Sequence, residues 1–269
     1  MSLEFSSQEL VSLHTSLAKL RLKADLTLLP KYPYFASKPY PLGRCKEIRD
    51  EVQRLLLMEF SKTECPAIRK IASYVQRGGV VHKAWGSLRD EYFQNAMLVD
   101  KWYLDVSNDT VHPNKPRVEV MLLADARFTQ ITSFELFAQI ARSYWQVEIY
   151  ANTVLPALAP YFPLICVNAA GASWLAAAND DMLAVAVGSQ FTLSERIMRA
   201  EAPAPGVVLR AWLTMLEPLR HQSPFYAQDA DSLSYCQRYR ESQSGLSIAQ
   251  RNDAVVAFSK LPSSVTIKS

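Results

Sequence analysis

Three residues carry the side chains that cysteine-dependent acyl transfer requires: Cys45, His82 and Asp105. In this chemistry a thiolate attacks a carbonyl carbon, an imidazole carries the proton, and a carboxylate holds the imidazole in a productive orientation. The order along the chain, with the thiol first and the imidazole and the acid after it, is compatible with a single site. We therefore take these three residues as a candidate catalytic set.

Cys45 lies at the expected start of a helix, because Gly43 and Arg44 precede it and apolar residues from Ile48 onward recur at helical spacing. The free N–H groups and the positive end of the helix dipole at such a place favour a thiolate. Arg44 and Lys46 act in the same direction. The alternative is a structural cysteine, since Cys45 stands three residues before Ile48 and can belong to the apolar stripe.

His82 and Asp105 lie in β-prone runs that predict a meander: Val80–Trp85, Tyr92–Val99 and Lys101–Val106. Side chains alternate between the two faces of a strand. A histidine on the first strand and an acid on the third can therefore face the same side of the sheet, as an imidazole oriented by a carboxylate requires.

Two adjacent amides, Gln94 and Asn95, occupy the middle strand and must face opposite sides. The one that shares the face of His82 can orient the imidazole or donate a hydrogen bond to a developing oxyanion. Asp109 is a second candidate for the orienting acid, and His112 is a second imidazole, expected in an exposed loop. The alternative is that all of these are ordinary polar positions of a half-solvated sheet.

The arrangement resembles the transglutaminase-like or papain-like cysteine fold over about residues 42–110. In that fold a central helix carries the nucleophile, and an antiparallel sheet carries the other two groups. The run Trp102-Tyr103-Leu104-Asp105 is similar to the strand end of those families, and His82-Lys83-Ala84-Trp85 approximates their His-x-Trp pattern. The resemblance implies a hydrolase or acyltransferase acting on a peptide, amide or thioester bond, with no cofactor.

A proline-stiffened segment over Leu29–Leu42 concentrates aromatic residues and is incompatible with a regular helix. Its aromatic side chains are expected to cover a core edge or to wall a cleft. In the second case the substrate-binding residues are Tyr32, Tyr34, Phe35, Tyr40 and Trp85. The competing function is non-catalytic: an accessory, chaperone-like or immunity protein that docks a protein or peptide partner through this loop and the edge of the sheet.

The composition excludes several classes of function. The 269 residues are 49% hydrophobic and 20% charged, as in a folded globular protein. Only 8 glycines are present, and neither GxGxxG nor GxxxxGK[ST] occurs, which argues against a nucleotide-binding scaffold. A net charge of +3 is too small to indicate nucleic-acid binding.

The four cysteines, at positions 45, 65, 166 and 236, form no CxxC pair, and no HExxH motif is present, so no metal site is expected. The sequence lacks a run of about 18 apolar residues and a secretory signal pattern. Free thiols in a reducing cytoplasm are expected, and export without a classical signal remains an alternative. No pattern specifies an oligomeric state.

Helical spacing continues after the meander, over 133–145, 173–187, 193–200 and 207–216. The expected fold is therefore α+β: N-terminal helices, a central mostly antiparallel sheet and a largely helical C-terminal half. We expect a single compact domain over 1–269, whose best internal subdomain break is the Pro-rich stretch 203–206. The last residues, PSSVTIKS, are expected to fray.

Overall fold

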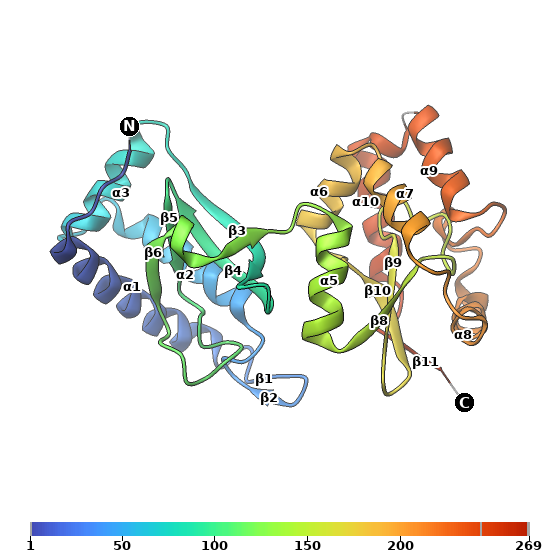
Figure 1. The fold of residues 1–269 in the computed structure, drawn as a ribbon, viewed down its shortest axis with the longest axis horizontal. Helices are drawn as coiled ribbons and strands as arrows, with labels where there is room; N and C mark the ends of the chain where they lie inside the picture. Colours follow the sequence, from blue (N-terminus) through green and yellow to red (C-terminus); the bar gives the residue numbers. More distant parts are fainter. Residues whose placement is uncertain (1, 243, 268–269) are drawn as a thin grey trace. The chain divides into compact units, whose positions relative to one another are not determined.

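The structure, a computed structural model, describes residues 2–242 and 244–267 and confirms the α+β class (Figure 1). The chain divides between Gln130 and Ile131 into two compact units, whereas the sequence suggests one domain with a break near 203–206. That stretch lies within the second unit, where the carbonyl of Ala202 accepts a hydrogen bond from the Ala151 N–H. Its prolines mark the start of a helix that begins at Gly206.

The first unit contains a curled antiparallel sheet of five strands in the order β6-β5-β4-β3-β7. The expected meander forms its middle. The strands are β3 (Val81–Leu88), β4 (Tyr92–Val99), β5 (Trp102–Asp105), β6 (Glu119–Leu122) and β7 (Phe128–Gln130). The meander edges are partly covered, because β6 pairs along the whole of β5 and β7 pairs with the last residues of β3. A Cβ added at Gly86 would lie 2.4 Å from the Thr129 carbonyl oxygen, so glycine at this position permits the close pairing with β7.

Helices cover one face of this sheet: α1 (Ser7–Leu28), α2 (Cys45–Glu59) and α3 (Pro66–Gln76). Ser6 and Glu9 form a capping box at the start of α1, and Pro66 occupies the first turn of α3. Leucines at three- and four-residue spacing along α1 pack with Ile48 and Val52 of α2 against Met97 and Val99 of β4. A smaller cluster, which includes Tyr92 and Tyr103, covers the opposite face together with the short helix α4 (Leu123–Ala126).

Between α1 and α2 the chain forms a two-stranded hairpin, β1 (Tyr34–Phe35) and β2 (Lys38–Pro39). Its turn residues, Ala36 and Ser37, have positive φ angles of 46° and 66°, the backbone twist that suits a tight hairpin. The hairpin follows the C-terminal end of α1 in Figure 1.

The second unit is built on an antiparallel sheet of four strands in the order β11-β10-β9-β8. Its strands are β8 (Val147–Ala151), β9 (Leu164–Asn168), β10 (Ala172–Ala176) and β11 (Val265–Thr266). Helices make up most of the rest, together with three short 3₁₀ turns. They are α5 (Phe134–Trp145), α6 (Asp180–Gly188), α7 (Thr192–Ala200), α8 (Gly206–Leu216), η1 (Glu217–Leu219), η2 (Pro224–Tyr226), α9 (Ser232–Glu241), η3 (Ser244–Leu246) and α10 (Ile248–Ser259).

Two sequence expectations are wrong in this unit. The helix expected over 173–187 is instead strand β10 followed by α6, because Ser173 to Ala176 pair with β9. The end expected to fray contains β11, whose Val265 and Thr266 pair with β10. The hydroxyl of Ser173 explains the attachment, since it donates to the Val265 carbonyl at 3.0 Å and accepts from the Trp212 indole at 2.9 Å. Residues 268–269 of that end lie outside the described residues.

Candidate functional site

Cys45 is the first residue of α2, as the sequence predicts, but its surroundings do not favour a thiolate. Burial raises the pKa of the Cys45 thiol, and the nearby charge of Asp105 acts in the same direction. The Asn95 amide donates a hydrogen bond to the sulfur at 3.2 Å and opposes these effects without outweighing them. The thiol is therefore a hydrogen-bonded packing group beneath α2.

His82 lies on the other face of the sheet from this thiol. In the register of β3 and β4, His82 lies opposite Leu98, and Leu98 lies opposite Tyr103 of β5. These residues share the face away from α2, whereas Asn95, which contacts Cys45, shares the face of Met97 beneath the helices. The imidazole is exposed to solvent, and the sheet separates it from the sulfur. The expected contact between Cys45 and His82 is thus not formed.

Asp105 does share the face of His82, as expected, but the two residues lie far apart. His82 is on β3 and Asp105 is on β5, so two strand spacings separate them. Asp105 is also two residues beyond Tyr103, which is the residue of β5 level with His82. With about 4.8 Å between strands and about 3.3 Å per residue, their Cα atoms are about 12 Å apart. The carboxylate therefore does not orient this imidazole.

The partners of Asp105 are instead buried neighbours. Its carboxylate accepts hydrogen bonds from the Gln94 amide at 2.7 Å, the Tyr103 hydroxyl at 3.1 Å and the Ser107 N–H at 2.8 Å. Burial nevertheless dominates and raises the pKa of Asp105 to about 6. Gln94 thus faces the same side of the sheet as His82. Its amide donates to the Asp105 carboxylate and to the Ser107 carbonyl, and so links β4 to the turn that follows β5.

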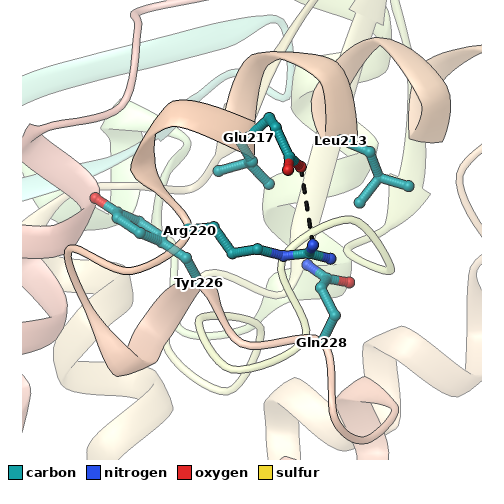
Figure 2. Close-up of a pocket in the computed structure, with 6 residues that line it drawn as sticks. Leu213, Glu217, Arg220, Tyr226 and Gln228 are labelled. Atoms are coloured by element: carbon teal, nitrogen blue, oxygen red, sulfur yellow. Dashed lines mark ion pairs between the residues drawn. The ribbon is translucent and has the colours of Figure 1, made fainter.

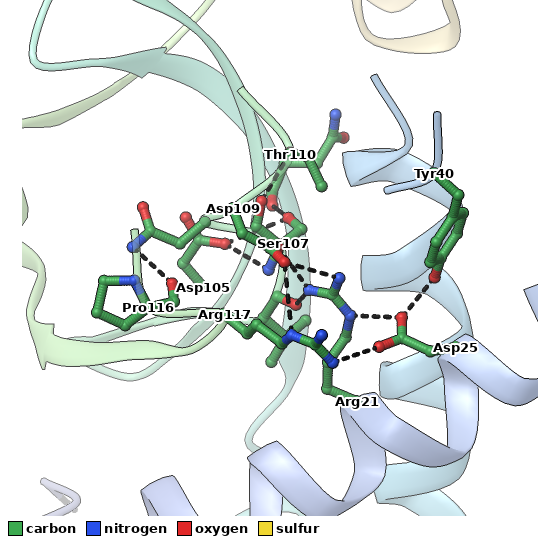
Figure 3. A network of polar contacts seen from close by, with 12 residues as sticks. Arg21, Asp25, Tyr40, Asp105, Ser107, Asp109, Thr110, Pro116 and Arg117 are labelled. Atoms are coloured by element: carbon green, nitrogen blue, oxygen red, sulfur yellow. Dashed lines mark hydrogen bonds and ion pairs between the residues drawn. The ribbon is translucent and has the colours of Figure 1, made fainter. Parts of the chain in front are cut away.

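The second candidate acid, Asp109, belongs to a buried ion-pair network that Figure 3 shows. The Arg21 guanidinium of α1 contacts both carboxylate oxygens of Asp109, at 2.8 and 3.2 Å, and also binds Asp25 at 2.7 Å. Arg117 approaches the same two acids from the solvent side, at 3.1 Å from Asp25 and 3.7 Å from Asp109. The Tyr40 hydroxyl completes the network by donating to Asp25.

His112, the second imidazole, is exposed as expected and lies edge-on to the ring of Tyr92, with 5.5 Å between ring centroids. It therefore lies over the small cluster on the face away from the helices. This position gives it no link to Cys45.

The aromatic residues proposed to bind substrate separate into two groups. Trp85 stacks on Phe93 of the sheet at 5.2 Å, and Tyr40 is tied to Asp25, so neither projects freely. Tyr32, Tyr34 and Phe35 are exposed. We call residues 32–40, which carry these three rings, the aromatic hairpin.

Arg44 holds the aromatic hairpin in place. Its guanidinium lies over the rings of Tyr32 and Phe35, at 4.8 and 5.0 Å from their centroids, and donates to the Tyr34 carbonyl at 2.8 Å. Gly43, with a φ of 72°, leaves room for the Phe35 ring, because a Cβ there would lie 2.4 Å from it. The rings of Tyr32 and Phe35 are thus exposed and yet held by Arg44, whereas Tyr34 is held through its backbone carbonyl.

Cys65, which sequence reasoning overlooked, has the more reactive environment. Burial raises the pKa of its thiol, but hydrogen bonds from the Ser12 and Ser16 hydroxyls and from the N–H groups of Ile68 and Ala67 outweigh burial and lower the pKa below its ordinary value. The Ser12 oxygen is 3.1 Å from the sulfur. Pro66, directly after Cys65, is the sequence signal that places this thiol at the start of α3.

A surface hollow of the second unit, about 240 Å³ in volume, is drawn in Figure 2. It is lined by Leu213, Leu216, Glu217, Arg220, Tyr226 and Gln228. Its polar groups have partners: the Tyr226 hydroxyl binds the Ala257 carbonyl, the Gln228 amide binds the Val154 carbonyl, and Arg220 lies 3.8 Å from Glu217. The volume is below the roughly 300–1,000 Å³ of ordinary ligand sites. The hollow therefore supports no catalytic assignment.

Within residues 2–242 and 244–267, no group of three or more His, Cys, Asp or Glu side chains is arranged to hold a metal ion. In the same part of the chain, no helix has the length and apolar content required to cross a membrane.

Comparison with protein-family models, with curated proteins and with solved structures finds no match to this chain. The resemblance to the transglutaminase-like or papain-like fold therefore stays an expectation from the sequence. Any functional assignment depends on the geometry described above.

Proposed function

We propose that this protein is a non-catalytic interaction protein that docks a protein partner through the aromatic hairpin. The observation that carries the proposal is the exposure of two aromatic rings at the tip, 66% for Tyr34 and 49% for Phe35. Aromatic and arginine side chains dominate the binding energy of protein interfaces, and here the Arg44 guanidinium lies against the Phe35 ring and donates to the Tyr34 carbonyl.

The rigidity of the hairpin supports the same proposal. Ordering a flexible loop on binding costs free energy, so a surface that is already ordered binds more tightly. The Arg44 contacts, the pairing of β1 with β2 and the hydrogen bond from the Gly43 N–H to the Thr110 carbonyl at 3.0 Å all restrain this segment before any partner arrives. Two exposed aromatic rings on a restrained support are typical of a recognition surface.

The separation of the candidate catalytic groups favours a binding role over acyl transfer. A cysteine nucleophile requires an imidazole within hydrogen-bonding reach. Cys45 lies beneath α2 next to Asn95, whereas His82 is exposed on the other face of the sheet. The groups of the acyl-transfer hypothesis therefore do not form a working set.

The test is affinity purification from the source cells with three baits: the wild-type chain, the double variant Tyr34→Ala/Phe35→Ala, and Tyr144→Ala as a control. Tyr144 is an exposed aromatic residue of the second unit, outside the hairpin. We expect partners recovered with the wild type and the control to be lost with the double variant. Circular dichroism of each bait checks folding. Undiminished recovery with a folded double variant refutes the proposal.

A further inference from the structure

Helix α1 has two apolar faces, and only one of them packs on the sheet. Leu13, Leu17, Leu20, Ala24 and Leu28 are buried against the core of the first unit. The opposite side carries Val11, Thr15, Leu22, Leu26 and Leu29, at steps of four, seven, four and three residues, while Ala18 between them is half-buried and packs against the core. We call these five residues the outer row. Steps of three, four and seven residues keep side chains on one side of a helix and are the spacing at which helices contact each other.

The leucines of the outer row are exposed: 55% for Leu22, 80% for Leu26 and 49% for Leu29, with Val11 at 68%. Single exposed apolar residues are common on proteins, but three neighbouring exposed leucines form an apolar patch of the kind that marks an interaction surface. From Val11 to Leu29 the row spans about 27 Å of helix, at about 1.5 Å per residue.

The outer row leads directly into the aromatic hairpin. Leu29 ends the row, and the chain turns at once, since the N–H groups of Lys31 and Tyr32 both donate to the Leu28 carbonyl. The row therefore adjoins the docking surface of the proposed function, and a partner can contact both surfaces together.

The charges beside the row are positive. Lys19 and Lys23 lie along one side and are exposed, and Lys31 lies just beyond the end. Arg117, 56% exposed, lies along the other side, where it already engages the acid Asp25. Glu59 lies 3.4 Å from Lys23 and 3.8 Å from Lys62, so this one carboxylate offsets only part of the positive charge on this side of the row.

These charges select the kind of helix that fits. A second copy of the chain would place Lys19 and Lys23 of one α1 against the same lysines of the other in an antiparallel pair, or against Arg117 in a parallel pair. Both arrangements bring like charges together, which destabilises a helix pair. A helix with an apolar stripe flanked by carboxylates complements both the row and its borders.

We propose that the outer row of α1 binds an amphipathic helix of a partner protein, in which Asp and Glu flank an apolar stripe. This inference rests on the proposed function, because it names the class of partner segment for the surface next to the aromatic hairpin. Leu22 and Leu26 provide the apolar contact, and Lys19 and Lys23 provide the charge selection.

Two synthetic 21-residue helical peptides with the same leucine stripe test the inference, one with Glu on both flanks and one with Lys. Fluorescence anisotropy measures each labelled peptide against the full chain at low and high salt. We expect the Glu peptide to bind at least tenfold more tightly than the Lys peptide and to weaken with salt. Leu26→Ser should weaken its binding about tenfold. Val256→Ser, which changes an exposed residue of α10, should leave it unchanged.

The charge-reversed variant Lys19→Glu/Lys23→Glu should prefer the Lys peptide. Equal binding of the two peptides, or full binding by a folded Leu26→Ser variant, overturns the inference. So does sedimentation velocity if it shows a wild-type dimer that Leu22→Glu/Leu26→Glu dissociates, because the row would then pair with a second copy. The peptide assay reports on the row and the affinity purification reports on the hairpin, so either proposal can fail without the other.

Discussion

The buried carboxyl of Asp105 predicts a pH dependence of stability whose size follows from its pKa. Burial raises this pKa from 3.8 to about 6, so between these two values the folded chain holds a proton that the unfolded chain has released. The stability that Asp105 contributes is complete below pH 3.8 and is lost as the pH rises through 6. A shift of about two pKa units corresponds to about 3 kcal/mol of folding free energy.

Urea unfolding of the wild-type chain and of Asp105→Asn, between pH 4 and pH 7.5, measures this effect. We expect the wild-type free energy of unfolding to fall by about 2–3 kcal/mol relative to the variant over that range. Asparagine has nearly the same size but no charge to titrate, so the difference between the two chains isolates the carboxyl.

A direct titration of the Asp105 carboxyl by ¹³C NMR provides a second measurement, which does not depend on a variant that folds. Its midpoint should lie near pH 6. Tyr103→Phe removes one donor to the carboxylate, so the midpoint should move to higher pH. A midpoint near 4, together with a pH-independent difference between wild type and Asp105→Asn, would refute the assignment of a desolvated acid.

Two further predictions concern the thiols and the buried ion pair. At pH 7.5, iodoacetamide should alkylate Cys65 faster than Cys45, as peptide mass spectrometry over time will show, because the pKa of the first thiol is lowered and that of the second is raised; faster labelling of Cys45 would contradict this. Arg21→Met should cost about 3–5 kcal/mol in urea unfolding, because it leaves Asp109 buried without its bidentate partner, whereas Arg117→Ala should cost less than about 1 kcal/mol. Equal losses for the two variants would show that burial does not control the strength of this network.

Local patterns in the sequence predict much of the first unit. The three strands of the meander occur where β-prone runs alternate, and α3 begins at the proline that signals it. Such features depend on near neighbours in the chain. The misassigned helix over 173–187 shows the limit, because β10 forms only by pairing with β9 and with the distant strand β11.

The candidate site was harder to predict, because the identity of a polar residue does not reveal its partners. Alternation correctly puts His82 and Asp105 on one face, but it does not give the distance between them, which depends on the register of three strands. Alternation also does not show that α2 packs on the opposite face of the sheet. This packing places Cys45 on the other side of the sheet from His82. For Cys45 the helix start favours the thiolate, but burial has the larger effect and raises the pKa.

Asp109 and Tyr40, two of the residues that the sequence singles out, share a role at the base of the aromatic hairpin. Arg21 links Asp109, in the turn after β5, to Asp25 on α1. Asp25 in turn accepts a hydrogen bond from the hydroxyl of Tyr40 at the end of the hairpin. The same turn accepts the Gly43 N–H through the Thr110 carbonyl. A buried ion pair contributes little net stability when compared with apolar packing, but it fixes geometry, because each partner is costly to leave alone. In the proposed function, this network fixes the base of the hairpin that presents Tyr34 and Phe35, so loss of the Arg21 pair should loosen the docking surface without removing any of its aromatic side chains.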